Sequence, residues 1–368
     1  MPRLRWRLLS TKLDRIKRRN TQTTSRDYKR DWRELPPELL FLISQKLADL
    51  RYVIRFRAVC KSWCSSVLLS DHPLQIPWLL ECDDIFIEGT RFSEELHFYS
   101  LADASPETKT GSIPIKECHH SSNYQGTGNG YLLVMDDCDL SLLNPLTNNT
   151  ISLPPVPSNC ISLFPVFFSS SDLVLAGRIF LGCDHGNWSC GIYHPDKMEW
   201  KCIDSDCFNT CYLNGMLFTT FGFDCTNVFD VTSGKKLYEI PQPEDEGPNA
   251  WGCYLVESCG VILRLSLYNT RDVDTNIFSI YKLNFERVEG QPCWVKVNNI
   301  GDQILFLDVR NGISVKATDG FKKNSIYFIT EDKHSRDHSL WRYDIATGII
   351  EMLHCPFERF MWFIPKIC

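Results

Sequence analysis

No stretch of this 368-residue chain approaches the roughly 20 consecutive apolar residues that a membrane-spanning helix needs. The start, MPRLRWRLLSTKLDRIKRR, scatters positive charge and lacks a continuous apolar centre, so we expect neither a membrane anchor nor a secretory signal. Paired clusters of closely spaced cysteines, which a structural zinc site needs, are also missing from the 17 cysteines. In a reducing compartment cysteine acts as a small buried hydrophobe, and we expect neither a metal nor a cofactor.

The patterns that carry catalysis are weak as well. The glycine-rich GTGNG at 126–130 opens the strand-like YLLVM and not a helix, so it does not fit a phosphate-binding loop. A metal site or a catalytic carboxylate pair would have to come from His334, His338, His354 and Cys355, or from Asp83–Asp84 and Asp136–Asp137. The first two histidines lie in a charged, loop-like segment, and adjacent carboxylates on a strand point to opposite faces. We therefore expect that the chain is not an enzyme.

The two signs of charge are unevenly divided along the chain. Residues 1–30 hold 11 Lys/Arg and two Asp/Glu, a net charge of +9, whereas the remainder holds 28 basic and 43 acidic residues, a net of −15. The acidic body would repel phosphates, so we expect no nucleic-acid partner. Residues 1–30 lack helical patterning after Arg19 and are typical of a solvated, disordered tail. The KLDRIKRR patch favours the nucleus or the cytoplasm, and an organellar transit peptide is the alternative.

Large apolar residues at helical spacing are concentrated in one segment, ELPPELLFLISQKLADLRYVIRFRAVCKSWCSS, at 34–66. Pro36 and Pro37 fit the opening of a helix, where a missing N–H is harmless. Glu38 follows in the first turn, where the helix dipole favours negative charge. A second helical run places on one stripe Val59, Trp63 and Val67. A domain this small is marginal unless it packs on the body of the chain or on a partner's helices.

This segment resembles an F-box, the helical module that docks on Skp1 in cullin–RING ubiquitin ligases. The Leu-Pro start and the Val-Cys-Lys-x-Trp end occur together, and the matched positions are Leu35, Pro36, Glu38, Leu39, Ile43, Leu47, Ile54, Phe56, Val59, Cys60, Lys61 and Trp63. Cys64 departs from the Arg that family members often have after the Trp. The resemblance implies that the residues binding Skp1 are Leu35, Pro36, Glu38, Leu39, Ile43, Leu47, Ile54, Val59 and Trp63. Val59 and Trp63 would be shared with the module's own core.

The rest of the chain repeats one outline six times: an apolar strand, a polar residue at a turn, and a second strand. The turn residues are Ser100, Asn144, His194, Asp230, Lys282 and Asp344. In DVTSG and DIATG the Asp carboxylates can accept backbone N–H groups two residues on, and Gly234 and Gly348 supply positive φ. A further strand often precedes the hairpin. Three or four strands every 36 to 62 residues predict an all-β propeller of six blades with kelch-like periodicity, and DQILFLD leaves room for a seventh.

The two ends of this body also carry a pattern. We expect the terminal MWFIP to pair with the segment around IPWLLE and to close the ring, and we expect Trp200, Trp294 and Trp341 in blade cores. The segments PCWVKVNNIGDQILFLD, KKNSIYFIT and MWFIP resemble the kelch-like domain of unknown function found in a large group of plant F-box proteins. That resemblance implies an adaptor and names no target.

Together these patterns divide the chain into a basic tail at 1–30, an all-α F-box at 31–72 and a β-propeller at 73–368. The resemblance implies a substrate-receptor subunit of an SCF-type (Skp1–cullin–F-box) ubiquitin ligase. The F-box would bind a Skp1-like protein and through it cullin, and the propeller would bind a protein target. We expect the two parts to be separable, with only secondary contacts between them. The alternative is a propeller enzyme or an organellar binding protein whose front helices pack only on its own body.

Overall fold

The computed structural model describes most of the chain beyond the predicted basic tail. The described residues are 32–47, 50–67, 76–81, 95–101, 111–114, 123–126, 130–136, 139–155, 160–169, 174–181, 188–194, 199–203, 209–220, 225–246, 250–268, 277–285, 291–308, 312–318, 320–332, 335, 337–355 and 357–365. The tail at 1–30, Asp83–Asp84, Asp137 and His334 lie outside these ranges.

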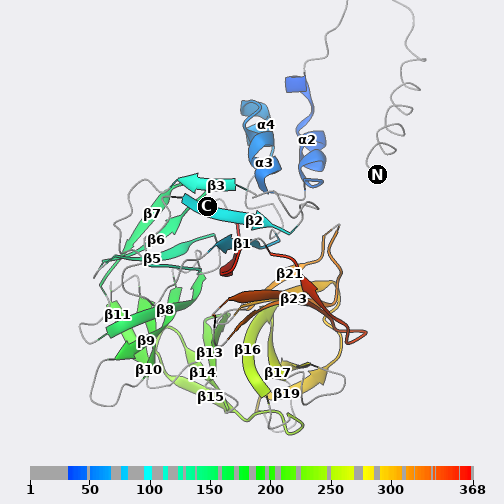
Figure 1. The fold of residues 1–368 in the computed structure, drawn as a ribbon. Coiled ribbons are helices and arrows are strands. Elements are labelled where there is room, and N and C mark those ends of the chain that lie inside the picture. The colour runs from blue at the N-terminus through cyan, green and yellow to red at the C-terminus, as the bar shows by residue number, and fades with distance from the viewer. Residues whose placement is uncertain are drawn as a thin grey trace, which may run out of the picture.

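Short helices form the first described part of the chain (Figure 1). They are the 3₁₀ turn η1 (Trp32–Glu34), α2 (Pro37–Ser44), α3 (Leu50–Arg57) and α4 (Lys61–Ser65). Pro37 opens α2 and Glu38 follows in its first turn, as the sequence predicted. The predicted second run through 59–67 is wrong as one helix, because Val59 lies in a bend after α3 and Cys60 caps α4 with extended backbone. None of the described helices is long and apolar enough to cross a membrane.

The described strands form six sheets, which we number 1 to 6 along the chain. Sheet 1 contains β25 (Phe360–Phe363), β1 (Trp78–Glu81), β2 (Glu95–Ser100) and β3 (Gly111–Pro114). Sheet 2 contains β4 (Asn123–Gly126), β5 (Leu132–Asp136), β6 (Asp139–Asn144) and β7 (Asn149–Leu153). Sheet 3 contains β11 (Glu199–Ile203), β10 (Trp188–His194), β9 (Val174–Leu181) and β8 (Cys160–Ser169).

The second half of the body has the same organisation. Sheet 4 contains β12 (Asn209–Leu213), β13 (Met216–Thr220), β14 (Thr226–Asp230) and β15 (Lys236–Ile240). Sheet 5 contains β16 (Ala250–Ser258), β17 (Val261–Tyr268), β18 (Phe278–Asn284) and β19 (Cys293–Val297). Sheet 6 has five strands: β21 (Gly312–Lys316), β20 (Gln303–Leu307), β22 (Ser325–Glu331), β23 (His338–Asp344) and β24 (Ile350–Leu353). The DQILFLD segment therefore joins sheet 6, where β20 pairs in parallel with β22.

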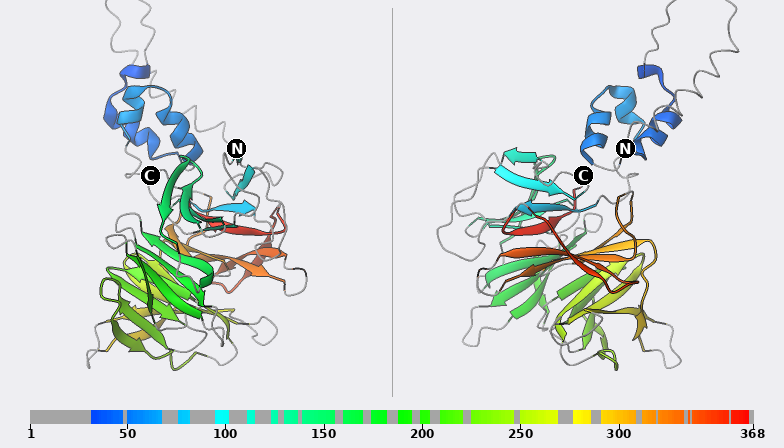
Figure 2. Two further views of the ribbon diagram at one scale, coloured as in Figure 1. Left: turned by 90° about the vertical axis from the view of Figure 1, so that its left-hand side faces the viewer. Right: turned by 45° about the vertical axis from the view of Figure 1, so that its right-hand side comes forward.

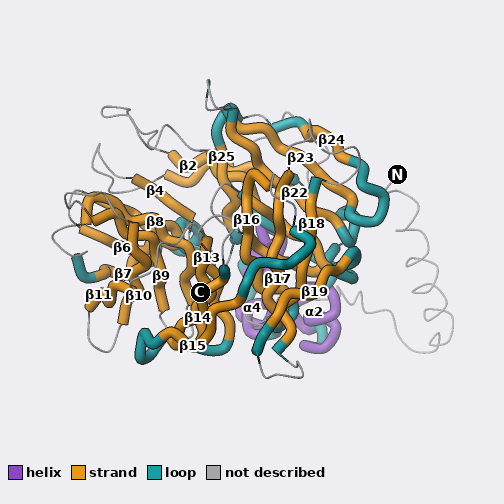
Figure 3. The backbone as a smooth tube through the Cα atoms, turned by 90° about the horizontal axis from the view of Figure 1, so that it is seen from below, coloured by secondary structure: helices purple, strands orange, loops and turns teal. Residues whose placement is uncertain are grey.

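The six sheets follow one another around a ring (Figures 1 and 2), and consecutive sheets share hydrophobic clusters. Adjacent strand residues point to opposite sides, so Leu132 packs toward sheet 1 and Leu133 toward sheet 3. Each of the six clusters can be identified by one residue from each of the two sheets that it joins. In order around the ring these pairs are Phe98 and Leu132, Leu133 and Tyr193, Ile192 and Leu217, Phe218 and Leu255, Leu265 and Ile326, and Phe306 and Tyr99. Because the last cluster joins sheet 6 to sheet 1, the body has a propeller arrangement. Seen from below, the helices lie behind these sheets (Figure 3).

The last strand closes the ring on the first. β25 pairs antiparallel with β1, with Trp78 opposite Phe363 and Glu81 opposite Phe360. The predicted pairing of the two terminal segments is confirmed. Sheet 1 is thus assembled from both ends of the body, since β1, β2 and β3 come from its start and β25 from its end.

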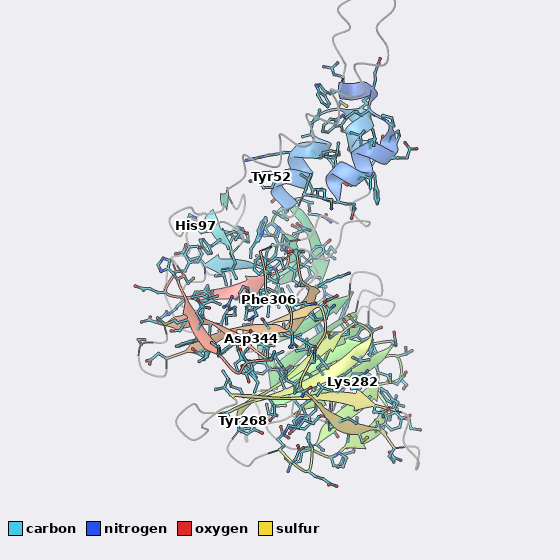
Figure 4. The ribbon with its side chains drawn as sticks, turned by 90° about the vertical axis from the view of Figure 1, so that its right-hand side faces the viewer. Tyr52, His97, Tyr268, Lys282, Phe306 and Asp344 are labelled. Carbon is cyan, nitrogen blue, oxygen red and sulfur yellow. The ribbon has the colours of Figure 1, made fainter. Side chains whose placement is uncertain are left out.

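Sheet 6 holds β25 from the other side. The Trp362 indole N–H donates to the Leu307 carbonyl at 3.0 Å, and its ring meets Phe306 edge-on at 4.9 Å between centroids. Figure 4 labels Phe306 within the sheet that supplies this contact. The His338 Nδ1 atom lies 2.7 Å from the Phe360 carbonyl oxygen and 3.0 Å from the Phe360 nitrogen. One indole, one imidazole and the shared apolar cluster therefore join the closing strand to its neighbour.

Most of the predicted hairpins are present, with one misplaced turn. In five strand pairs, the first strand ends at a predicted turn residue and pairs antiparallel with the next strand. These pairs are β2–β3, β6–β7, β10–β11, β14–β15 and β23–β24. The predicted turn at Lys282 is wrong, because this residue lies inside β18. It is paired with Leu263 of β17 on one side and with Val295 of β19 on the other. The strand ends at Asn284 and its partner is β19. The tryptophans expected in strand cores, Trp200, Trp294 and Trp341, all pack in or against hydrophobic clusters.

Two of these turns use the predicted aspartate chemistry. The Asp344 carboxylate accepts the backbone N–H groups of Ala346 at 3.0 Å and Thr347 at 3.1 Å. Asp230 instead accepts the N–H of Ser233 at 2.7 Å, three residues on. The prediction of positive φ is confirmed, with values of 64° and 71° for the glycines that end the two turns. The Lys322 ammonium and the turn N–H groups hold the pKa of Asp344 below its usual range.

A buried ion pair lies between sheets 4 and 5. The Arg264 guanidinium on β17 donates from Nη2 to Glu246 at 2.9 Å, and both side chains are almost fully buried. Its Nη1 lies 3.4 Å from the hydroxyl oxygens of Thr220 and Thr226 on sheet 4. The Ser266 hydroxyl also donates to Glu246. Each buried charge thus has several partners, which is the condition for tolerating charge in an interior.

We predict that Glu246→Ala destabilises the chain far more than Asp245→Ala. The first change leaves the Arg264 charge without its carboxylate, which typically costs about 3–5 kcal/mol. Asp245 pairs with Lys296 at the exposed surface, where such a pair contributes up to about 1 kcal/mol. Chemical denaturation of both variants measures the difference, and equal losses of stability would contradict a special role for the buried pair.

We also predict that deleting Phe360–Cys368 lowers the thermal unfolding midpoint far more than deleting residues 1–28. The first deletion removes β25 and exposes the edge of β1, which also favours aggregation. The second removes a segment with the composition of a solvated tail. Scanning calorimetry of the two deletions is the measurement. Equal midpoints would show that β25 does not close the ring.

Candidate partner-docking surface

The helices have a small core of their own. Leu40, Phe56 and Val67 are its buried members, and it is completed by the half-buried Leu35, Leu47 and Trp63. The rings of Phe56 and Trp63 meet at 4.5 Å between centroids. The Trp63 indole N–H donates to the carbonyl of Trp32 at 3.0 Å, which ties α4 to η1. The Arg57 guanidinium donates to the Val67 carbonyl and ties the end of α3 to the segment after α4.

The helix α2 leaves most of its apolar side chains outside this core. Leu40 is fully buried, but its neighbours Leu39 and Leu42 are 48% and 60% exposed. Phe41 and Ile43 are exposed as well. Leu39, Leu42 and Ile43 have the spacing i, i+3, i+4 and therefore lie on one side of the helix, and we call these three exposed side chains the α2 face. Phe41 is exposed on another side of the same helix. Exposed apolar residues gathered in this way are typical of a surface that binds a partner.

The predicted partner-binding residues are distributed over several environments. Pro36, Glu38, Leu39, Ile43 and Val59 are exposed, whereas Leu35, Leu47 and Trp63 are half-buried in the module. Ile54 lies in α3, and the environment of its side chain is not described. The structure brings Leu39 and Ile43 together on α2. Leu42 is exposed but was not among the predicted residues, because LLFLI is apolar on every side and does not mark which side is outward. Trp32, also exposed and not predicted, lies outside that run, in η1.

The stripe of Val59, Trp63 and Val67 does not exist. Val59 is 53% exposed in the bend before α4, while Val67 is fully buried after its end. The helix between them has only five residues, so the spacing of four does not place the three side chains on one side. Trp63 alone keeps the predicted position against the module's core.

The module contacts the propeller through α3. Val53 is fully buried in a cluster with Trp78, Leu80, Phe98 and Phe363 of sheet 1. Leu47 packs against this cluster and also against the core of the module. Figures 1 and 2 show the helices directly beside this sheet. The two parts therefore share a buried contact, and their separability as fragments stays a prediction.

The groups considered for chemistry in the body have structural surroundings. His338 bonds to Phe360 as described above, and His354 is exposed. Burial raises the pKa of the Cys355 thiol to about 12, and the same cause raises the pKa of Cys253 to about 12. Within the described ranges, no three His, Cys, Asp or Glu side chains are grouped to hold a metal ion. Of the GTGNG segment, Gly126 ends β4 and Gly130 has a φ of 80° before β5, while residues 127–129 lie outside the described ranges.

One known protein family matches the β-sheet body of the chain. The family model of the KIB1-4 beta-propeller matches residues 98–345, about two thirds of the chain. The chain belongs to the KIB1-4 beta-propeller family. This match spans from within sheet 1 to the turn after β23, so the KIB1-4 assignment rests on the ring of sheets.

Relatives of this KIB1-4 chain in Arabidopsis thaliana have F-box names. The putative F-box protein At4g22170 is 24% identical, over 91% of this chain and 96% of its own length. F-box only protein 7 is 23% identical over 96% and 98%, and F-box protein KIB4 is 25% identical over 59% and 60%. Among solved structures, the N-terminal domain of Nup159 is 10% identical to this chain. The alignment covers 71% of this chain and 85% of the Nup159 chain, with a TM-score of 0.33. The likenesses support an F-box protein with a propeller.

We predict a large loss of stability for one leucine of α2 and almost none for its neighbour. Leu40→Ala removes a fully buried side chain from the module's core and should cost about 2–5 kcal/mol of local stability. Leu39→Ala removes an exposed side chain and should change stability by less than about 0.5 kcal/mol. Hydrogen exchange of the helices α2 to α4 measures both. Equal protection in the two variants would contradict the assignment of an inner and an outer side of α2.

Proposed function

We propose that this chain is the substrate-receptor subunit of an SCF-type ubiquitin ligase. The observation that carries the proposal is the α2 face, an exposed apolar surface on a module whose own core is already complete. Neither the module nor the propeller covers Leu39 and Leu42 among the described residues. The Leu-Pro start and the Val-Cys-Lys-x-Trp end of the same module, and the F-box names of the relatives, favour Skp1 as the protein that covers it.

The chemistry of the face suits helices of a partner. Leucine and isoleucine side chains on a helix pack into apolar grooves between other helices, and burying each fully is worth about 1.5–3 kcal/mol. Pro36 and Glu38 are exposed at the start of α2 and would border the contact. Val59 would extend the contact from the bend before α4. Leu35, Leu47 and Trp63, which are half-buried against the module's core, and Ile54 of α3 complete the set of residues that we propose for the contact.

The propeller would supply the second contact, to a protein target. We propose that each of the six sheets is one blade and that the kelch-like repeat period follows from them. The rims of such rings consist of loops, which vary without disturbing the sheets and therefore suit recognition of different partners. A receptor of this kind makes and breaks no covalent bond. It raises the effective concentration of the target near the ubiquitin carrier that cullin recruits.

Pro36→Ala combined with Leu39→Asp should abolish Skp1 binding. The substitutions remove an anchor and place a charge in an apolar contact, which costs several kcal/mol, on the order of a hundredfold or more in affinity. Both positions are exposed, so the chain should stay folded. Pull-down of a purified Skp1-like protein by the full-length chain is the measurement, with circular dichroism to check folding.

Met352→Asp is the matched control for this experiment. Met352 lies on β24 and is 65% exposed, so the control also places a charge on an exposed apolar position. We expect it to bind the Skp1-like protein as well as the unchanged chain does. Undiminished recovery with the Pro36→Ala, Leu39→Asp variant would refute the F-box assignment, and equal losses in both variants would indicate a nonspecific effect of charge.

A further inference from the structure

The contact between the helical module and sheet 1 is built like a protein interior. Val53 on α3 is 0% exposed, although α3 otherwise carries arginines at both ends and an exposed Tyr52 (Figure 4). The cluster that contains Val53 has its other buried members on β1, β2, β5 and β25, and they include the aromatic residues Trp78, Phe98 and Phe363. A hydrophobic side chain that was merely tethered near a surface would not be fully enclosed.

The aromatic residues of this cluster, Trp78, Phe98 and Phe363, are also packed against one another. Phe98 and Phe363 lie 5.2 Å apart between ring centroids, and Trp78 meets Phe98 edge-on at 5.7 Å. Trp78 and Phe363 face each other across the β1–β25 pair and are 6.4 Å apart. Because these rings are close-packed, the site that receives Val53 has a fixed shape. Leu47 extends the contact from the segment after α2 and joins it to the core of the module.

We propose that Val53 is a positioning residue, which fixes the helical module on sheet 1 and thereby sets the direction of the α2 face relative to the propeller. The role in ubiquitin transfer rests on the function proposed above, but the fixed orientation does not. The contact depends on the end of the chain as well, since Phe363 belongs to the closing strand. The module can therefore reach its final position only on a propeller whose last strand is in place.

The proposal predicts separate effects for two valines of the same module. Val53→Ala removes two methyl groups from the enclosed site and should raise the undocked population about tenfold, and Val53→Asp should raise it further. Phe363→Ala, on the opposite side of the contact, should act in the same direction. Val59→Ala alters an exposed valine outside the contact and should leave the docked population unchanged.

The measurement is the distribution of distances between two spin labels, one on each part of the full-length chain. Because the chain has 17 cysteines, the labels are attached to noncanonical residues introduced at Ser65 on α4 and Lys323 before β22. Both positions are exposed. We expect one narrow distribution for the unchanged chain and for Val59→Ala, and an added broad component for Val53→Ala, Val53→Asp and Phe363→Ala. If Val53→Asp fails to fold, Val53→Ala decides.

Binding of the purified Skp1-like protein to the same samples separates this proposal from the previous one. Val53→Ala should bind as the unchanged chain does, whereas Val59→Ala should bind more weakly. A broad distribution in the unchanged chain, or an unaltered one in Val53→Ala, would overturn the positioning role even if Skp1 binds. A narrow distribution that broadens in Val53→Ala would support it even if Skp1 does not bind, and only the ligase function would then fail.

Discussion

The pairing of β25 with β1 is the contact on which the rest of the structure depends. It joins residues 360–363 to residues 78–81, across almost the whole body, so the entropy of closing that loop must be offset by the contacts that form there. Those contacts lie on both sides of the strand. Trp362 packs toward sheet 6, and Phe363 packs toward the cluster that sheets 1 and 2 share. Because β25 has partners on both sides, closure completes two of the clusters of the ring at once.

The same strand links the ring to the helices. Phe363 contributes to the cluster that encloses Val53, so the two parts of the chain share a hydrophobic core at sheet 1. A propeller without the helices would expose this site, and a helical module without the propeller would expose Val53. The helices are thus part of the folded unit on one side and open to solvent at the α2 face on the other. That division suits the proposed function, in which one small module is fixed to the propeller and presents its outer side to a second protein.

Local chemistry explains what could be predicted from the sequence. The turns at Asp230 and Asp344 depend on a carboxylate and a glycine a few residues apart, and the strand periods depend on apolar pairs. Lys282 was misplaced because the stretch around it has no such turn residues, and β18 continues to Asn284. The two sides of α2 could not be distinguished, since five consecutive apolar residues give no periodic signal. The contact of Val53 with sheet 1 includes Phe363 of the closing strand, which is about 310 residues away in the sequence, so the local pattern of residues around Val53 could not predict it.

The interface between sheets 4 and 5 carries a buried ion pair. Between sheets 4 and 5, Arg264 and Glu246 add a buried, directional contact to the apolar packing. Glu246 comes from the segment that joins β15 to β16, so the ion pair holds the connection as well as the two sheets. Apolar clusters tolerate small sliding movements, whereas a guanidinium with several fixed partners accepts only one arrangement. Buried pairs often add little net stability, and we infer that this one instead restricts how the two sheets sit against each other. In the proposed function a fixed angle would serve the rim of the propeller, because loops can recognise a target only if the sheets beneath them hold their positions.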